Sequence, residues 1–284
     1  MNKIDHICFL GTPDFSVPIL DKIVSSFSSS TISVISMPDR PKGRRGTPTP
    51  SPVRQYGLTN GLTTYTPENK QLLTQQLQDL SPDLIIVVAY GMILEQVITD
   101  TFFCINIHAS LLPKYRGASP IHSALINGDQ ETGNTLIHMN EKMDEGNILL
   151  LDSFPIDQND NLLTLTEKLK QNAAHLIVYF IQNQYLNKSF TETPQDHNAA
   201  TYTKKITKEE LEITSFNNPN HVHNKIRAFS PKPGAYVNHN GKRLKLIQSS
   251  LINGQLKLLE VQPEGKAIMT YNDYLLGYSE GFKL

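Results

Sequence analysis

The sequence predicts an α/β fold, a mostly parallel sheet covered by helices, followed by a small β domain. Three observations support this. Short apolar runs alternate with amphipathic helical runs over roughly the first 190 residues, which is typical of α/β proteins. The run LIIVVAY (84–90) is apolar on both faces, as in a central parallel strand. After residue 205, short strands are joined by Asn-Gly turns.

The elements of the first part follow from residue spacing. Compact apolar runs predict strands, and apolar residues three or four apart predict helices. The predicted elements are strand 6–11, helix 16–27, strand 31–37, a loop of Pro, Gly and Arg at 38–54, helix 69–80, strands 84–90, 103–108, 134–139 and 147–154, and helix 161–186. In such a sheet, ligands bind beyond the carboxyl ends of the strands.

The pattern changes at the polar stretch 191–205, which predicts a linker. We therefore expect a catalytic domain at 1–190 and a small β-barrel-like domain at 206–284. One helix at about 218–229 precedes hairpins at Asn240-Gly241 and Asn253-Gly254. About fifty residues follow Pro233, which is short for five strands, so we expect a reduced or open barrel.

Composition excludes several classes of protein. Hydrophobic residues make up 39% of the 284 residues and the formal net charge is −1, which indicates a globular chain. From Lys204 onward, twelve Lys and Arg face seven Asp and Glu, so the C-terminal part is basic on an acidic body. Two cysteines within apolar runs suit a reducing cytoplasm. No apolar run is long enough for a signal peptide or a membrane span.

Two polar side chains stand at the end of the strand 103–108. Asn106 and His108 are two residues apart, so they project from the same face of the strand. An irregular loop, SLLPKYRG, follows them, and Asp144 lies in a loop between the next two strands. A carboxylate beside His108 would orient the ring and favour its charged form. Hydrogen bonding at the strand end is the simpler interpretation of the Asn-His pair taken alone.

Converging Asn, His and Asp side chains suit stabilisation of an oxyanion together with proton transfer. This chemistry is acyl transfer without a covalent nucleophile. No Cys or His spacing indicates a metal site. The stretch GTPDFSVP at 11–18 lacks the G-x-G-x-x-G pattern, which disfavours a dinucleotide cofactor.

The loop 38–54 is strongly basic. It carries five cations against the single acid Asp39, with Gly and Pro between them and no apolar period. Such loops contact phosphates and become ordered on binding. A solvated loop without a ligand is the alternative. The cations are Arg40, Lys42, Arg44, Arg45 and Arg54.

Two stretches of the chain, INIHASLLPKYRGASPI and GDQETGNTLIHMNEKMDEGNIL, closely resemble the folate-dependent formyltransferases that use 10-formyltetrahydrofolate. Within that family, FLGTPDFSVPIL, PDRPKGR, SPDLIIVVAYGMIL and RAFSPKPGAY resemble the members that act on a charged tRNA. The resemblance covers nearly the whole chain. It implies a Rossmann-like catalytic domain and an OB-like C-terminal barrel.

The resemblance also implies an activity and its residues. The donor would be 10-formyltetrahydrofolate, the acceptor the α-amino group of initiator methionyl-tRNA, and no metal would be needed. Family members have catalytic residues at the positions of Asn106, His108 and Asp144. Residues implied at the folate are Ala89, Tyr90, Gly91, Met92, Ile93, Ser110, Leu111, Leu112 and Pro113, and those at the tRNA are Arg40, Lys42, Arg44 and Arg45.

The C-terminal part departs from the family pattern. A piece present in longer members is missing between LKLIQSS and NGQLKLLEV, and Lys232 stands where the family usually has an aromatic residue. This puts C-terminal tRNA contacts in question. Lys242, Arg243, Lys245 and Lys257 still supply charge, although exposed strand lysines also serve solubility and edge protection.

Three other functions stay open at this point. An enzyme that formylates an amino group on a nucleotide-linked sugar would share the Asn-His-Asp set but have no use for the arginine-rich loop. A catalytically silent RNA-binding protein would not need that set. Hydrolysis of the formyl donor is a conceivable side activity. We expect a cytoplasmic monomer.

Overall fold

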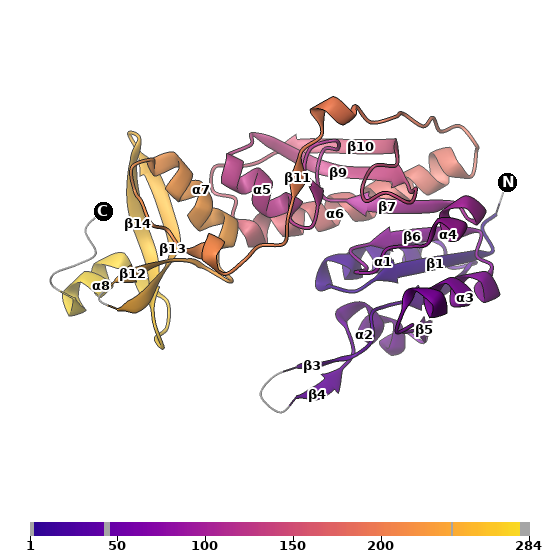
Figure 1. Ribbon diagram of the computed structural model, residues 1–284, viewed down its shortest axis with the longest axis horizontal. Helices are drawn as coiled ribbons and strands as arrows, with labels where there is room; N and C mark the ends of the chain where they lie inside the picture. Colours follow the sequence, from indigo (N-terminus) through magenta and orange to yellow (C-terminus); the bar gives the residue numbers. More distant parts are fainter. Residues whose placement is uncertain (1–2, 43–45, 240, 279–284) are drawn as a thin grey trace. The chain divides into compact units, whose positions relative to one another are not determined.

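The computed structural model describes residues 3–42, 46–239 and 241–278 (Figure 1). The chain divides into two compact units, each built from three segments. The sheet unit comprises Met1–Arg116, Gly133–Ser153 and Lys168–Thr201. The C-terminal unit comprises Gly117–Thr132, Phe154–Glu167 and Tyr202–Leu284. The boundaries at 190 and 205 inferred from the sequence stay a prediction.

A seven-stranded sheet forms the centre of the sheet unit, in the order β10-β9-β7-β6-β1-β2-β5. The strands β7, β6, β1, β2 and β5 pair in parallel, and β9 pairs antiparallel with β7. The predicted α/β class with a mostly parallel sheet is therefore confirmed. The strands are β1 (His6–Gly11), β2 (Thr31–Ile35), β5 (Thr63–Tyr65), β6 (Leu84–Val88), β7 (Cys104–His108), β9 (Glu131–His138) and β10 (Asn147–Pro155).

Helix starts in the sheet unit follow local signals in the sequence. The side chain of Ser51 accepts a hydrogen bond from the backbone N–H of Arg54, and Asn69 does the same for Leu72. Proline occupies the first turn of α1 and α2, where its missing N–H costs nothing. The helices are α1 (Val17–Ser26), α2 (Pro52–Thr59), α3 (Lys70–Leu80), α4 (Gln96–Thr101) and α6 (Leu162–Phe180), with a π-helical turn at Ile181–Tyr185.

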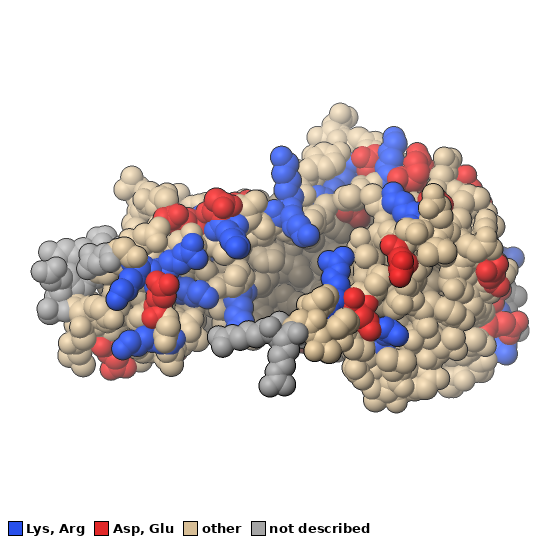
Figure 2. Space-filling model, turned by 60° about the horizontal axis from the view of Figure 1, so that its bottom comes forward, with Lys and Arg blue, Asp and Glu red and all other residues tan. Residues whose placement is uncertain are grey.

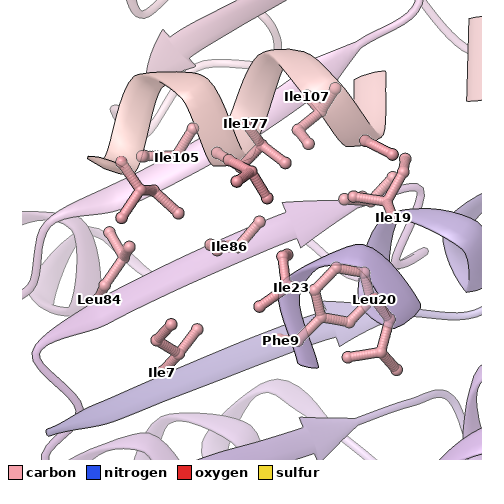
Figure 3. Packing of buried hydrophobic residues seen from close by; sticks show 14 of the residues in the cluster. Ile7, Phe9, Ile19, Leu20, Ile23, Leu84, Ile86, Ile105, Ile107 and Ile177 are labelled. Atoms are coloured by element: carbon pink, nitrogen blue, oxygen red, sulfur yellow. The ribbon is translucent and has the colours of Figure 1, made fainter. Parts of the chain in front are cut away.

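Alternate side chains of the central strands pack into two separate cores, one on each face of the sheet. Ile7 and Phe9 of β1 join Ile23 of α1 and Ile177 of α6 (Figure 3). Cys8 and Leu10 join the opposite core, which also holds Leu73 and Leu77 of α3. This two-sided burial explains why the central strands are apolar at successive positions. It also leaves the carboxyl edge of the sheet as the place for polar side chains.

The stretch 38–54 differs from the loop predicted there. It contains a short hairpin, β3 (Arg40–Lys42) and β4 (Thr47–Thr49), and the first turn of α2. Gly46 adopts a φ of +64°, a left-handed conformation that glycine reaches without strain. In Figure 1 the hairpin projects from the sheet unit beyond α2.

The C-terminal unit has an antiparallel sheet with the strand order β12-β13-β14-β15. The hairpin at Asn253-Gly254 is confirmed, since both residues have positive φ. In the hairpin predicted at Asn240-Gly241, Asn240 lies outside the described residues. Over the described part of the chain, the barrel-like domain is thus a four-stranded sheet. The elements are α5 (Pro120–Asn127), α7 (Pro219–Phe229), β12 (Ala235–His239), β13 (Lys242–Ile252), β14 (Gln255–Pro263), β15 (Met269–Thr270) and α8 (Tyr271–Gly277).

One face of this sheet packs on α7. Val222, Ile226 and Phe229 of the helix form a core with Leu244 and Leu246 of β13. Ile126 of α5 packs against the same core. Across residues 3–42, 46–239 and 241–278, every helix is too short or too polar to cross a lipid bilayer.

Candidate active site

The carboxyl end of β7 presents Asn106 and His108 on one side of the sheet. His108 is 6% exposed and Asn106 is half-buried. Asn106 pairs with Val87 of the neighbouring strand β6, and His108 pairs with Thr135 of β9. The site therefore lies where the parallel strands of an α/β sheet end, the usual position of a ligand.

The loop between β9 and β10 brings Asp144 to these two side chains. The Nδ2 of Asn106 donates to Oδ1 of Asp144 at 3.2 Å. The same oxygen lies 3.6 Å from Nδ1 of His108, and both side chains of this ion pair are largely buried. Asp144 has a φ of +56°, which a residue with a side chain rarely adopts. The three residues predicted as catalytic thus lie together, and their catalytic role stays a proposal.

Both ring nitrogens of His108 face protein groups. Nε2 lies 2.8 Å from the backbone oxygen of Tyr115, and because a carbonyl can only accept, Nε2 carries a proton. Nδ1 faces the carboxylate of Asp144. A neutral ring would point its lone pair at that carboxylate, whereas an imidazolium points an N–H at it.

The loop after His108 is held by Thr135. The hydroxyl of Thr135 donates to the backbone oxygen of Ser110 at 2.6 Å and accepts from the backbone N–H of Leu112 at 3.1 Å. Ser110 is buried, and its hydroxyl donates to the carbonyl of Lys114. Leu112 is also buried, whereas Leu111 and Pro113 are partly exposed. The segment expected at the folate is thus tied by hydrogen bonds to Thr135 of β9.

The second segment expected at the folate, 89–93, leaves the carboxyl end of β6. Ala89 and Gly91 have φ values of +47° and +105°, and both are exposed. Ile93 is 49% exposed and Met92 is half-buried. Tyr90 instead turns into the core at 2% exposure, where burial raises the pKa of its hydroxyl above the usual range. The turn therefore offers backbone groups and apolar side chains at the same edge as Asn106.

The basic hairpin is described only in part. Arg40 is exposed on β3, and the backbone of Lys42 ends that strand. Arg44 and Arg45 lie outside the described residues. Arg54 forms a 2.5 Å ion pair with Asp39, so the single acid of this stretch is balanced by the arginine at the start of α2.

Three site neighbours were missed by sequence reasoning. Arg116 is 1% exposed, and Gln195, 6% exposed, accepts hydrogen bonds from its Nε and Nη2. Thr201 bonds to the backbone of Tyr115. Gln195 and Thr201 come from the polar stretch predicted as a linker. No periodicity or motif in the sequence points to Gln195 or Thr201 as part of the site. A glutamine in a polar loop is ordinarily exposed to solvent, so the sequence gives no reason to single it out.

Other parts of the described chain offer weaker candidates for a functional site. No three His, Cys, Asp or Glu side chains in the described residues are grouped to hold a metal ion. A cavity of about 540 Å³ is lined by Asp83, Tyr185 and Phe190, among others. Asp83 directly precedes β6, so this cavity belongs to the amino edge of the sheet, away from the carboxyl edge that holds Asn106 and His108.

Comparisons with known proteins identify the family of this chain. The formyl transferase family matches residues 5–181, and the formyl transferase C-terminal domain matches residues 205–255. The methionyl-tRNA formyltransferase of a Hydrogenobaculum species is 40% identical, over 93% of this chain and 87% of its own. That of a Jannaschia species is 39% identical over 96% of both chains.

Solved structures share the fold. The methionyl-tRNA formyltransferase of Clostridium thermocellum has a TM-score of 0.63 and 19% identity, over 92% of this chain and 99% of that one. An N-formyltransferase of Helicobacter canadensis, solved with folinic acid and dTDP-3-aminofucose, has a TM-score of 0.66 and 23% identity, over 88% of this chain and 89% of its own. From the family match and relatives of this identity, the chain belongs to the methionyl-tRNA formyltransferase family.

Proposed function

We propose that the protein transfers the formyl group of 10-formyltetrahydrofolate to the α-amino group of initiator methionyl-tRNA. The observation that carries this proposal is the meeting of Asn106, His108 and Asp144 at the carboxyl edge of the sheet. All three lie within residues 5–181, where the formyl transferase family matches. The curated relatives named above support the choice of acceptor.

The trio suits the chemistry of formyl transfer. The neutral amine attacks the formyl carbon, and negative charge grows on the formyl oxygen. The amide of Asn106 has a second N–H besides the one on Asp144, and this N–H can donate to that oxygen. When protonated, the ring of His108 adds a positive charge beside it. One well-placed donor contributes about 3–4 kcal/mol to such a transition state.

Asp144 has two roles in this proposal. It orients the ring of His108, whose Nδ1 lies 3.6 Å from its carboxylate, and it assists removal of the proton that the attacking amine must lose. The bond between the formyl carbon and N10 of the folate breaks as the amine becomes an amide, and the proton lost by the amine passes, directly or through water, to N10 of the departing tetrahydrofolate. Direct donation from Nε2 of His108 would require the carbonyl of Tyr115 to give way.

The donor would bind along two neighbouring segments. The exposed backbone of Ala89 and Gly91 can form hydrogen bonds with the edge of a heteroaromatic ring, and Ile93 supplies apolar contact. The loop Ser110–Pro113 forms the adjoining wall, braced by Thr135. The folinic acid bound to the Helicobacter protein supports a folate in this family.

The acceptor would meet basic side chains from two places. Arg40, Lys42, Arg44 and Arg45 in the β3–β4 region suit a phosphate backbone. Lys and Arg side chains also gather over the C-terminal strands in Figure 2. Both the donor and a charged tRNA are cytoplasmic molecules, so we place the activity in the cytoplasm.

A sugar acceptor is the second candidate, because a structure solved with a dTDP-linked amino sugar shares this fold. The deciding experiment offers 10-formyltetrahydrofolate together with charged initiator methionyl-tRNA, with a dTDP-linked amino sugar, or with no acceptor. We expect formylated methionine on the tRNA alone, and loss of product in the Asp144→Ala variant. Formylated sugar with unmodified tRNA would refute the proposal, and tetrahydrofolate released without an acceptor would indicate hydrolysis.

The basic segment has its own test. The Arg44→Ala variant should raise the KM for methionyl-tRNA and leave the KM for the folate unchanged, since a phosphate contact acts only on the acceptor. The rise should shrink with increasing salt, because counterion release scales with the number of phosphates contacted. Equal changes in both KM values would contradict this assignment. Lys70→Ala, an exposed cation at the start of α3, is a matched control.

A further inference from the structure

A single buried amide holds the loop that carries Asp144. The Nε2 of Gln195 donates to the backbone oxygens of Asp144 and Gly146, each at 2.8 Å. Its Oε1 accepts from Nε and Nη2 of Arg116 at 3.1 and 2.8 Å. Both donors and both lone pairs of the amide are therefore used. Arg116 also contacts Glu145 at 3.3 Å, so all three loop residues are held from one side.

The backbone at this loop needs such support. Asp144 has a left-handed φ of +56°, and Tyr115, whose carbonyl contacts His108, has a φ of +62°. Residues with side chains persist in this region only when the surrounding structure fixes them, and they concentrate at active sites. Both neighbours of His108 are thus held in unfavourable conformations.

The same short segment supports the second neighbour. The hydroxyl of Thr201 accepts from the backbone N–H of Tyr115 at 2.8 Å, and its carbonyl accepts from that of Arg116 at 2.9 Å. We name residues 195–201 the strap. One end of the strap holds Asp144 through Gln195, and the other holds Tyr115 through Thr201. The two groups that flank the ring of His108 therefore share one support.

We propose that Gln195, Arg116 and Thr201 are positioning residues that set the ion pair and the ring orientation of His108. This inference rests on the proposed formyl transfer. Its physical basis is that Asp144 reaches His108 at 3.6 Å only with its backbone in a conformation that the strap maintains. Without the hydrogen bonds from the strap, the backbone of Asp144 would relax toward a negative φ, and its carboxylate would move away from the ring of His108.

A purely stabilising role makes a different prediction, because activity would then follow stability. The variant Gln195→Glu separates the two. Glutamate keeps an acceptor for the guanidinium of Arg116, so the buried pair and the fold survive. It has no N–H to donate, and its carboxylate meets the carbonyls of Asp144 and Gly146 with like partial charge.

The experiment compares Gln195→Glu with Asn134→Ala. Asn134 is fully buried and donates to Leu169 and Asn172, away from the Asp144 loop, so its loss costs stability alone. We expect Gln195→Glu to lower kcat by about tenfold or more, with both KM values little changed and the melting temperature lowered no more than by Asn134→Ala. Asn134→Ala should lower the melting temperature and keep kcat. A kcat for Gln195→Glu within about twofold of wild type would overturn the proposal.

A second pair keeps the test decisive if Gln195→Glu does not fold. Thr201 is exposed, so Thr201→Val removes the hydroxyl at little cost to the core, and Thr201→Ser retains it. The valine variant should lose kcat and the serine variant should recover it. Equal kcat values for the two would refute the strap's role at Tyr115.

Hydrogen exchange provides a readout that does not depend on the reaction. Amides in 140–147 should exchange faster in Gln195→Glu than in wild type, and those in 113–117 faster in Thr201→Val. Unchanged exchange in both segments would refute the inference even if the wild type formylates tRNA. Faster exchange with no formyl transfer by the wild type would retain the strap and reject the proposed function.

Discussion

Replacing Gly146 by alanine should disable the enzyme by moving one loop. A Cβ on Gly146 would lie 1.9 Å from the backbone oxygen of His138 and 2.9 Å from its carbonyl carbon. Ordinary contact begins at 3.4 Å, and the obstacle is backbone at the end of a central strand, which cannot rotate away. The loop must therefore move away from β9 by about 1.5 Å, the difference between the 3.4 Å of ordinary contact and the 1.9 Å to the oxygen of His138.

That displacement affects activity and stability differently. Gly146 follows Asp144 by two residues, so a retreat of about 1 Å is enough to weaken the ion pair with His108 and to lower kcat by on the order of 100-fold. The overpacking itself costs about 1–3 kcal/mol of unfolding free energy. For a protein of this size, each kcal/mol lowers the melting temperature by roughly 2–4 °C.

The assay is formyl transfer to methionyl-tRNA at saturating concentrations of both substrates, with thermal melting in parallel. The matched control is Gly277→Ala in α8, where an added Cβ meets nothing within 4 Å. It should leave both kcat and the melting temperature near wild type. A Gly146→Ala enzyme with wild-type kcat would refute the link between the loop backbone and catalysis.

Three further predictions address other parts of the molecule. Asn106→Ala and His108→Ala should each lower kcat by about 10²–10³-fold without changing the melting temperature, and near-wild-type turnover in steady-state assays would remove the mechanism. Ile86→Ala, in the core that also holds Ile7 and Phe9, should reduce the unfolding free energy measured in urea by about 2–5 kcal/mol and leave both KM values unchanged. An unchanged urea midpoint would contradict the packing described. Burial lowers the pKa of His122, so this ring is neutral when folded and takes up a proton on unfolding. Stability should therefore fall below about pH 6.5, by at most about 1.4 kcal/mol per pH unit, and urea titrations of His122→Gln should show a shallower slope than wild type.

The sequence allowed most of the sheet to be predicted, because burial on two faces leaves a visible pattern. Strand β6 is apolar at every position, and the alternation of β1 sends Ile7 and Cys8 into different cores. The placement of Asn106 beside His108 followed from the two-residue period of a strand. The approach of Asp144 could be anticipated only from its loop between two strands and from the resemblance to the formyltransferase family.

Features that depend on tertiary contacts could not be predicted in the same way. Helix α5 has Pro120 in its first turn, yet its apolar side meets α7, far along the chain. The sequence does not indicate the left-handed backbone of Asp144, because no local pattern around this aspartate requires that conformation. Gln195 donates to two backbone carbonyls. Because every residue has a backbone carbonyl, the residue types that accept these hydrogen bonds give no sign of the contact in the sequence.

The assembly of the C-terminal unit from three separated segments has a consequence for protein synthesis. Helix α5 ends at Asn127, and its packing partner α7 begins at Pro219. At ordinary rates of translation, the roughly ninety intervening residues take about 5–20 s to emerge from the ribosome. Throughout that interval the apolar surface around Ile126 lacks the helix that covers it, so the nascent chain exposes an apolar surface to which a chaperone can bind until α7 is made.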